Sequence, residues 1–469
     1  MLLAPKVELE GPEDIFEDDD EDDDDVDGDD QHEDEDEVEV EERGEHKDQV
    51  AVEEQVLNGE FPDGNEATLW LSTFISPSLR TLNLWFAYGD SILSHLYTTT
   101  ILGLLTQKCP QLRRLGHKLS ITAAGYDHEF IEQVAASQLV LTPFACGHLQ
   151  SLQHLAQLTI RGNFINSETL VALSCLSKLE KLTINQVVQP NKHLPQVFKD
   201  AQLSEGSFSA LRRLQIRSHI LDDFLAAWNT SPLVLGLKEI SLEYESTNKK
   251  WVGPVYEDTI LRPLLLGIAT SSPNTESLTL TSTRMDHPLS TDLGGSPWTC
   301  IEHLPLRYLE LVNFEVDAAS LKNVEQIWHK LDILNMPDQL LTLQHLVHLS
   351  RLPKLKKLCA AGFEDLTEQI PEAELYECSP LHTIKLKKPM TDQVEIKSTE
   401  KVARFLLVLW PKLQRIVYVT GSGETLQPNL ELLNVHIRMF QGLETSKKRI
   451  LKRYGSDAVK LLDRRLSSF

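Results

Sequence analysis

Three short groups of residues have types that could do chemistry, but none has the spacing that the chemistry needs. His128 and Glu129, in DHEFIE, begin like the helix of a zinc protease, but no second histidine follows at the required spacing. The segment GSGET at Gly421 lacks the spacing and the lysine of a phosphate-binding loop. His345 and His348 could share a helix face, yet no third ligand accompanies them. We therefore expect a protein that is not an enzyme, with no catalytic residues, no metal and no cofactor.

Charged side chains at alternate positions of short apolar segments are better candidates for recognition. Alternate residues of a strand share a face, so these positions would form a basic patch with acidic residues beside it and a second, later basic group. The patch comprises Arg161, Lys181, Arg213 and Arg217 with Glu239 and Glu243, and the later group comprises Lys357, Lys385, Lys387 and Arg415. One interpretation is a groove for a partner with acidic groups, which arginine binds through forked donors. The other is a set of ordinary solvated positions on an exposed face.

The segments that carry these residues share one recurring phrase: leucine, two variable residues, leucine, one variable residue and another aliphatic residue. It reads SLRTLNL at Ser78, KLEKLTI at Lys178, ALRRLQI at Ala210 and LRYLEL at Leu306. We call the second aliphatic residue of each phrase its register residue. The register residues lie at positions 82, 115, 158, 182, 214, 240, 278, 309, 334, 358, 384 and 416, a mean step of about 30 that is close to the leucine-rich-repeat period.

Amphipathic segments between the phrases predict helices. Apolar residues at spacings of three and four begin at Asp90, Glu257 and Thr399, and prolines precede many of the next phrases, as at Pro110 and Pro232. A single strand-and-helix unit cannot bury its own apolar face, whereas stacked units can. We therefore predict an α/β leucine-rich-repeat solenoid of about twelve irregular repeats, with parallel strands on the concave side and helices on the convex side.

Almost all of the net charge lies in one N-terminal tract. Residues 13–48 contain 24 carboxylates against Arg43 and Lys47, whereas residues 49–469 carry only about −2 of the total charge of −25. Such a tract has too little apolar surface to fold alone, so we predict a disordered acidic arm over residues 1–60. It could be a solubilising spacer, a lure for basic proteins such as histones, or a tether that covers the chain's own groove.

The predicted solenoid then covers residues 61–442, and a basic helical tail covers residues 443–469. The six cysteines form no CxxC pair and are expected to be reduced and mostly buried. Neither a secretory signal nor an apolar run long enough for a membrane span is present in the sequence. We expect a protein of the cytoplasm or nucleus, not secreted, with neither a membrane nor a specific nucleic acid as its partner.

The phrases CPQLRRL, SPNTESLTL and WPKLQRI, with the helix-bearing repeat length, resemble the leucine-rich repeats of F-box proteins, particularly the large basidiomycete fungal set. The resemblance covers about Ser78 to Gly442. It implies a substrate receptor of cullin-type ubiquitin ligases, in which the F-box binds an adaptor and the repeats bind the substrate. This chain departs from the pattern at Gln49 to Pro77, which does not supply the expected three-helix F-box.

Two functional hypotheses follow, both non-catalytic. The first is a protein-binding solenoid that presents a substrate for ubiquitination, with the adaptor as a further partner if an F-box exists. The second is a binder or chaperone of basic proteins that acts through residues 13–48, similar in parts to acidic leucine-rich nuclear phosphoproteins. A scaffold with no link to a ligase is a further alternative.

Overall fold

The structure is a computed structural model that describes residues 56–61, 73, 75–87, 91–120, 143–162, 165–187, 194–218, 221–245, 254–283, 289–290, 297–364, 379–387, 399–420, 423–425, 428–454, 456 and 459–460. Most of the predicted acidic arm, residues 1–55, lies outside these residues. The sheet begins at Val56, five residues before the predicted start of the solenoid at residue 61.

A single fourteen-stranded sheet runs through the described chain, and consecutive strands are neighbours in it. Its parallel strands are β1 (Val56–Phe61), β2 (Thr81–Ala87), β3 (Arg114–Ser120), β4 (Gln157–Arg161), β5 (Lys181–Val187), β6 (Arg213–Ser218), β7 (Glu239–Tyr244), β8 (Ser277–Ser282), β10 (Tyr308–Val312), β12 (Ile333–Leu341), β13 (Lys357–Phe363), β14 (Thr383–Leu386) and β15 (Arg415–Thr420). The last strand, β16 (Gly423–Thr425), pairs antiparallel with β15. A separate pair consists of β9 (Leu289–Ser290) and β11 (Phe314–Glu315).

The predicted register is confirmed at every repeat. From Leu82 in β2 to Ile416 in β15, each of the twelve register residues pairs directly with the register residue of the next strand. All twelve have an exposed fraction of 7% or less. Their side chains therefore form one continuous apolar row along the solenoid, because each repeat covers the apolar side chains of the preceding repeat.

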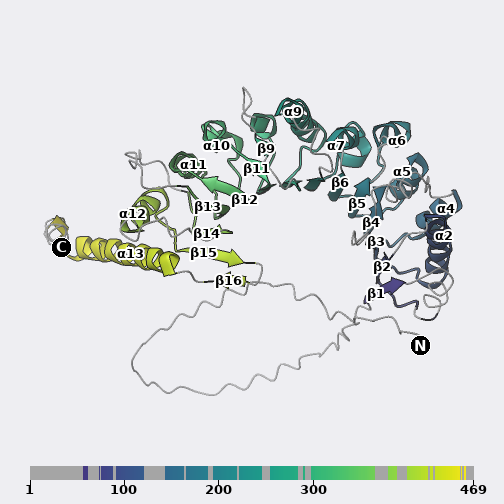
Figure 1. Ribbon diagram of the computed structural model, residues 1–469, viewed down its shortest axis with the longest axis horizontal. Coiled ribbons are helices and arrows are strands. Elements are labelled where there is room, and N and C mark those ends of the chain that lie inside the picture. Colours follow the sequence, from purple (N-terminus) through teal and green to yellow (C-terminus); the bar gives the residue numbers. More distant parts are fainter. Residues whose placement is uncertain are drawn as a thin grey trace, which may run out of the picture.

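Helices cover the opposite side of the sheet and give the molecule its curvature. Strands line the inner side of an arc and helices its outer side, which confirms the leucine-rich-repeat solenoid (Figure 1). The helices are α2 (Ser91–Lys108), α4 (Pro143–Ser151), α5 (Ser167–Ser174), α6 (Leu194–Asp200), α7 (Leu221–Trp228), α8 (Ser231–Val234), α9 (Pro254–Ser271), α10 (Val324–Ile327), α11 (Leu343–Leu349), α12 (Thr399–Leu409) and α13 (Pro428–Tyr454), with 3-10 turns at Pro297–Ile301 and Ala318–Leu321.

The helix boundaries follow the predicted punctuation. Pro110, Pro273 and Pro411 each lie two residues beyond the end of a helix, where a missing backbone donor costs nothing. Pro232 follows the end of α7 by four residues and is also the second residue of the short helix α8. Proline is also favoured in the first turn of a helix, because its fixed φ suits a helix and its missing N–H would have no partner there.

A hydrogen-bond ladder fixes the turns that lead into the strands. The carbonyl of Arg80 accepts from the backbone N–H groups of Arg113 and Arg114 at 2.8 and 3.0 Å. The carbonyl of Arg113 in turn accepts from the next repeat, and the same two-donor arrangement continues through most repeats to His382. The side chains at these positions are therefore held at a regular place along one edge of the sheet.

The last parallel strand is closed by side chains from α13. The amide of Asn434 accepts from the backbone N–H of Ile416 at 2.8 Å and donates to the carbonyl of Ile416 at 2.7 Å. Gln441 also donates to the carbonyl of Leu413 at 2.6 Å. Because an open strand edge is a template for pairing with other chains, these amides stand in for a missing repeat. The helix runs without a break through residues 442 and 443, so the predicted basic tail continues the helix that caps the sheet.

We expect Asn434→Leu to lower the free energy of unfolding by about 2 kcal/mol, because it leaves the buried N–H and carbonyl of Ile416 unpaired. The exposed neighbour Val435, changed to leucine, should alter it by less than about 0.5 kcal/mol. Urea unfolding measures the loss, and hydrogen exchange should quicken at the Ile416 amide. Equal losses in the two variants would contradict the capping role.

Candidate protein-binding surface

The concave face presents the residues that alternate with the register residues. Because the strands are in register, the residue after each register residue forms a row across the sheet. From β8 to β14 this row reads Thr279, Glu310, Asn335, Cys359 and Lys385. Neighbouring strands lie about 4.8 Å apart, so such side chains contact one another across the strands.

The predicted basic patch on β4 to β7 is only partly basic. Arg213 Nε lies 3.1 Å from Glu239 Oε2, and Arg217 is paired with Glu243 and, at 3.6 Å, with Glu245. The hydrogen bond to Glu243 raises the pKa of the Arg217 guanidinium. These predicted binding residues therefore neutralise one another across β6 and β7. Residues at equal offsets from the register residue are direct neighbours, so each of these arginines faces one of the acidic residues expected beside the patch.

The other two members of the patch differ. Lys181 begins β5 and is half-buried. Arg161 is the last residue of β4, and its side chain is not among those that the structure describes.

The later basic group lies on or directly after three adjacent strands. Lys357 begins β13, Lys385 lies in β14, Lys387 follows β14 directly, and Arg415 begins β15. Within the described part of the chain, the exposed side chains of Lys357 and Lys387 make no ion pair. This group gives the C-terminal half of the concave face a concentration of positive charge on three adjacent strands.

An anionic cluster that the sequence reading missed lies beside this basic group. Tyr308 donates from its hydroxyl to Glu310 Oε2 at 3.0 Å, and Thr279 donates to the same oxygen at 3.3 Å. Asn335 donates to the other oxygen, Oε1. Glu310 is thus held by side chains from β8, β10 and β12, three strands in a row. The alternation of buried and outward-facing residues that identified Arg213 would also have identified Glu310, if it had been applied to the segment that forms β10.

The half-buried side chains between these two groups have altered acidities. Burial, followed by the charge of Glu310, raises the pKa of Tyr308 to about 12. Burial also raises the pKa of the Cys359 thiol, although the charges of Lys387 and Lys385 oppose that rise. Cys359 is therefore neutral at physiological pH and unsuited to act as a nucleophile. The concave face changes from anionic to cationic between Glu310 and Lys385.

Comparison with known proteins gives fold-level likenesses only. No family model and no curated protein sequence matches the chain. Among solved structures, it resembles the leucine-rich repeat-containing protein LegL7 from Legionella pneumophila, with 13% identity over 82% of this chain and 98% of that chain and a TM-score of 0.36. It also resembles a chain of the yeast Rad7 and Elc1 complex, with 18% identity over 78% and 86% of the two chains and a TM-score of 0.38. An internalin from Listeria monocytogenes shows 13% identity over 64% and 80%, with a TM-score of 0.30.

The residues first considered for chemistry have other positions or roles. His345 is buried and caps α11: its Nδ1 accepts from the Thr342 N–H at 3.1 Å, and its Nε2 donates to the Val316 carbonyl at 2.8 Å. Burial lowers the pKa of His348. His128, Glu129 and Gly421 lie outside the described residues. Over the described ranges, no cluster of histidine, cysteine or carboxylate side chains could hold a metal ion.

The cysteines and helices add two further observations. Cys109 and Cys146 are buried, Cys300 and Cys359 are half-buried, and Cys175 is exposed, so fewer of the described cysteines are buried than expected. Cys378 lies outside the described residues. Of the helices that the structure describes, none combines the length and the apolar character that a membrane crossing requires.

We expect Glu310→Gln to lower the pKa of Tyr308, because the substitution removes a negative charge that opposes formation of the phenolate. The pKa should stay above its ordinary value of 10, since burial is the larger cause. Titration of ¹³C-labelled tyrosine by NMR measures the change. Glu239→Gln, on β7, should leave the pKa of Tyr308 where it is, and an equal shift in both variants would contradict the cluster.

Proposed function

We propose that the protein binds other proteins on its concave face and recognises acidic side chains there. The observation that supports this most is the basic group Lys357, Lys385, Lys387 and Arg415 on three adjacent strands, next to the anionic Glu310 cluster. On β6 and β7 positive and negative side chains lie opposite one another, whereas all four residues of this group are positively charged. A partner that places carboxylates over β13 to β15 and a donor over Glu310 would match both signs, which favours one orientation.

We further propose that this binding selects substrates for a cullin-type ubiquitin ligase. The support is the resemblance of the repeat phrases to those of F-box proteins, not the structural likenesses. The segment from Gln49 to Pro77 does not act as the adaptor-binding module in this proposal. Val56–Phe61 pairs with β2 as a strand of the solenoid, whereas an F-box consists of helices. An adaptor would therefore bind elsewhere on the chain.

The ligase assignment predicts that the full chain captures the adaptor and cullin subunits in a pulldown with purified components. The expected result is retention of both subunits, with the cullin retained only when the adaptor is present. Retention of neither subunit would remove the ligase assignment and leave a binding solenoid without that role.

The binding surface itself is tested by charge reversal. Acidic peptides selected from a display library against the full chain should bind the Lys385→Glu, Lys387→Glu variant at least about tenfold more weakly, because each lost charge-assisted contact costs about 1 kcal/mol or more. The matched control is Lys199→Glu with Lys401→Glu, two exposed lysines on α6 and α12 of the convex side. Fluorescence anisotropy measures the affinities. Equal weakening in both variants would show a general charge effect and not a site.

The tract supports a second function, capture of basic proteins. Its 24 carboxylates within residues 13–48 give a density of charge that speeds association with cationic partners. Histone binding by the full chain that disappears on deletion of residues 13–48 would support this function. Unchanged histone binding after the deletion would contradict it.

A further inference from the structure

The positive charge of the solenoid is concentrated along one edge of the sheet. We call this the basic edge: the four residues that precede each of the twelve register residues. These positions hold 15 lysine and arginine residues and four carboxylates, a net charge of +11. Residues 49–469 as a whole carry about −2, so the rest of this region is acidic by contrast. The edge is therefore a line of charge and not a sample of the average surface.

The fold holds these charges in line. Because β2 to β15 are parallel, the residues that lead into each strand all lie at the same edge of the sheet. The carbonyl ladder that begins at Arg80 fixes them one strand spacing apart, about 4.8 Å. Three of the twelve repeats, those of Leu158, Leu278 and Ile384, hold no lysine or arginine at these positions. Where adjacent repeats each carry a cation, as at Arg307, Lys330 and Lys354, the charges lie within one screening length of about 8 Å at physiological salt, so their fields add.

The carboxylates of the basic edge are largely in use already. Asp332 lies 3.0 Å from Arg307 and 3.3 Å from Lys356, while Glu276 lies 3.1 Å from Lys238. Glu239 is the partner of Arg213, as described above. By contrast, several exposed cations of the edge have no carboxylate partner in the part of the chain that the structure describes: Arg113, Arg114, Arg212, Lys330, Lys354, Lys357 and Lys412.

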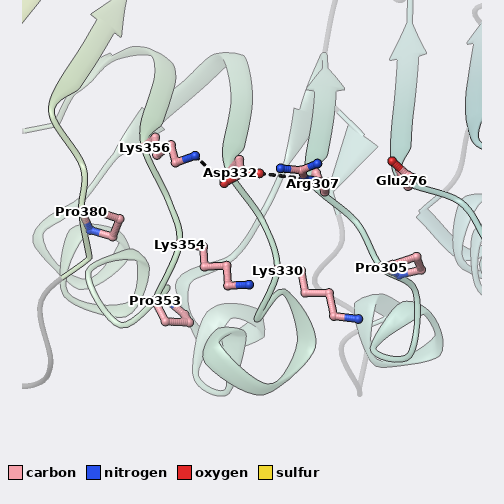
Figure 2. A pocket seen from close by; sticks show the side chains of 9 residues that line it. All are labelled: Glu276, Pro305, Arg307, Lys330, Asp332, Pro353, Lys354, Lys356 and Pro380. Atoms are coloured by element: carbon pink, nitrogen blue, oxygen red, sulfur yellow. Dashed lines mark hydrogen bonds and ion pairs between the residues drawn. The ribbon is translucent and has the colours of Figure 1, made fainter.

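A hollow of about 510 Å³ is formed where β10 to β14 begin. Figure 2 shows Lys330 and Lys354 extending in the same direction from neighbouring turns, with Asp332 held between Arg307 and Lys356. Pro305, Pro353 and Pro380 line the hollow and stiffen its walls. It therefore offers two lysines without carboxylate partners, beside Glu276 and Asp332, whose carboxylates are already paired with cations.

We propose that the basic edge is the binding surface of the chain's own acidic tract, residues 13–48, with the hollow at Lys330 and Lys354 as a main contact. The charges are opposite in sign: −22 on the tract and +11 on the edge. The point of entry matches as well. Residue 48 is only eight residues before Val56, which begins β1 at the same edge of the sheet, so the tract is delivered there.

The length of the tract is sufficient. Nine strand spacings separate β1 from β12, roughly 43 Å at about 4.8 Å each. An extended chain covers that distance in about 13 residues, so residues from about 43 backwards can reach the hollow. The local concentration of a tethered segment is in the millimolar range, which favours it over free acidic partners. Lys357 and Arg415 belong to both the basic edge and the proposed concave binding group, whereas the hollow itself contains neither Lys385 nor Lys387.

The first test is carbodiimide crosslinking of the full chain at low salt, which joins lysine amines to carboxylates in contact. Mass spectrometry of the monomer should find Lys330 and Lys354 linked to residues 13–48, and about 0.5 M salt should abolish the links by screening. Links spread evenly over all exposed lysines would overturn the proposal. Links found only in a dimer would overturn it too, since they would place a second copy on the edge.

The second test measures the binding of fluorescent polyglutamate to the edge. Deletion of residues 13–48 should raise the affinity at least about tenfold by removing a competitor of millimolar local concentration. Lys330→Glu with Lys354→Glu in the deleted chain should abolish most of that gain, while Lys199→Glu with Lys401→Glu should retain it. Thermal melts check that each variant is folded. An affinity unchanged by the deletion, or a gain that survives the Lys330 and Lys354 substitutions, would overturn the proposal.

Discussion

Side-by-side burial of aliphatic residues is the interaction on which the rest of the structure depends. No repeat is large enough to enclose its own leucines, and Leu278 is fully buried in a row that Ile240 of β7 and Leu309 of β10 continue on either side. The same stacking aligns the strands, and aligned strands let each turn carbonyl accept from the next turn. Residues at the same position of successive repeats therefore lie side by side on the surface of the solenoid.

A stack of repeats has an open strand edge at each end, and in this protein other elements cover the C-terminal edge. Among the residues that the structure describes, no further repeat follows Ile416 to pair with its backbone groups, and Asn434 supplies both partners from a helix. β16 covers the next residues of the same edge through antiparallel pairing. Together they convert a potential pairing site for other chains into a finished surface, which is the role of capping elements in repeat proteins.

Most of the fold could be predicted from the sequence, because the spacing of leucines specifies both strand and register. Features that depend on neighbours across strands were harder. The register of the strands places Arg213 opposite Glu239, but their ion pair was not predicted from the sequence. The strand β1 was missed because VLNGEF contains a single leucine and does not match the recurring phrase. Asn434 could not be found by any pattern, since a single polar residue in a helix gives no sign of the strand edge beneath it.

The distribution of charge on the solenoid also follows from the stacking of the repeats. A bias toward lysine and arginine in the four residues before the register residue is a minor feature of any single repeat, but stacking brings the cations of adjacent repeats about 4.8 Å apart. Like charges at that spacing repel, which opposes the compact stack unless counter-charge is near. Salt ions in solution supply some of this counter-charge, and the acidic tract, which is tethered to the solenoid, would supply it at fixed stoichiometry. The separation of charge between tract and solenoid, which is puzzling in the linear sequence, is therefore consistent with two parts of one electrostatic unit.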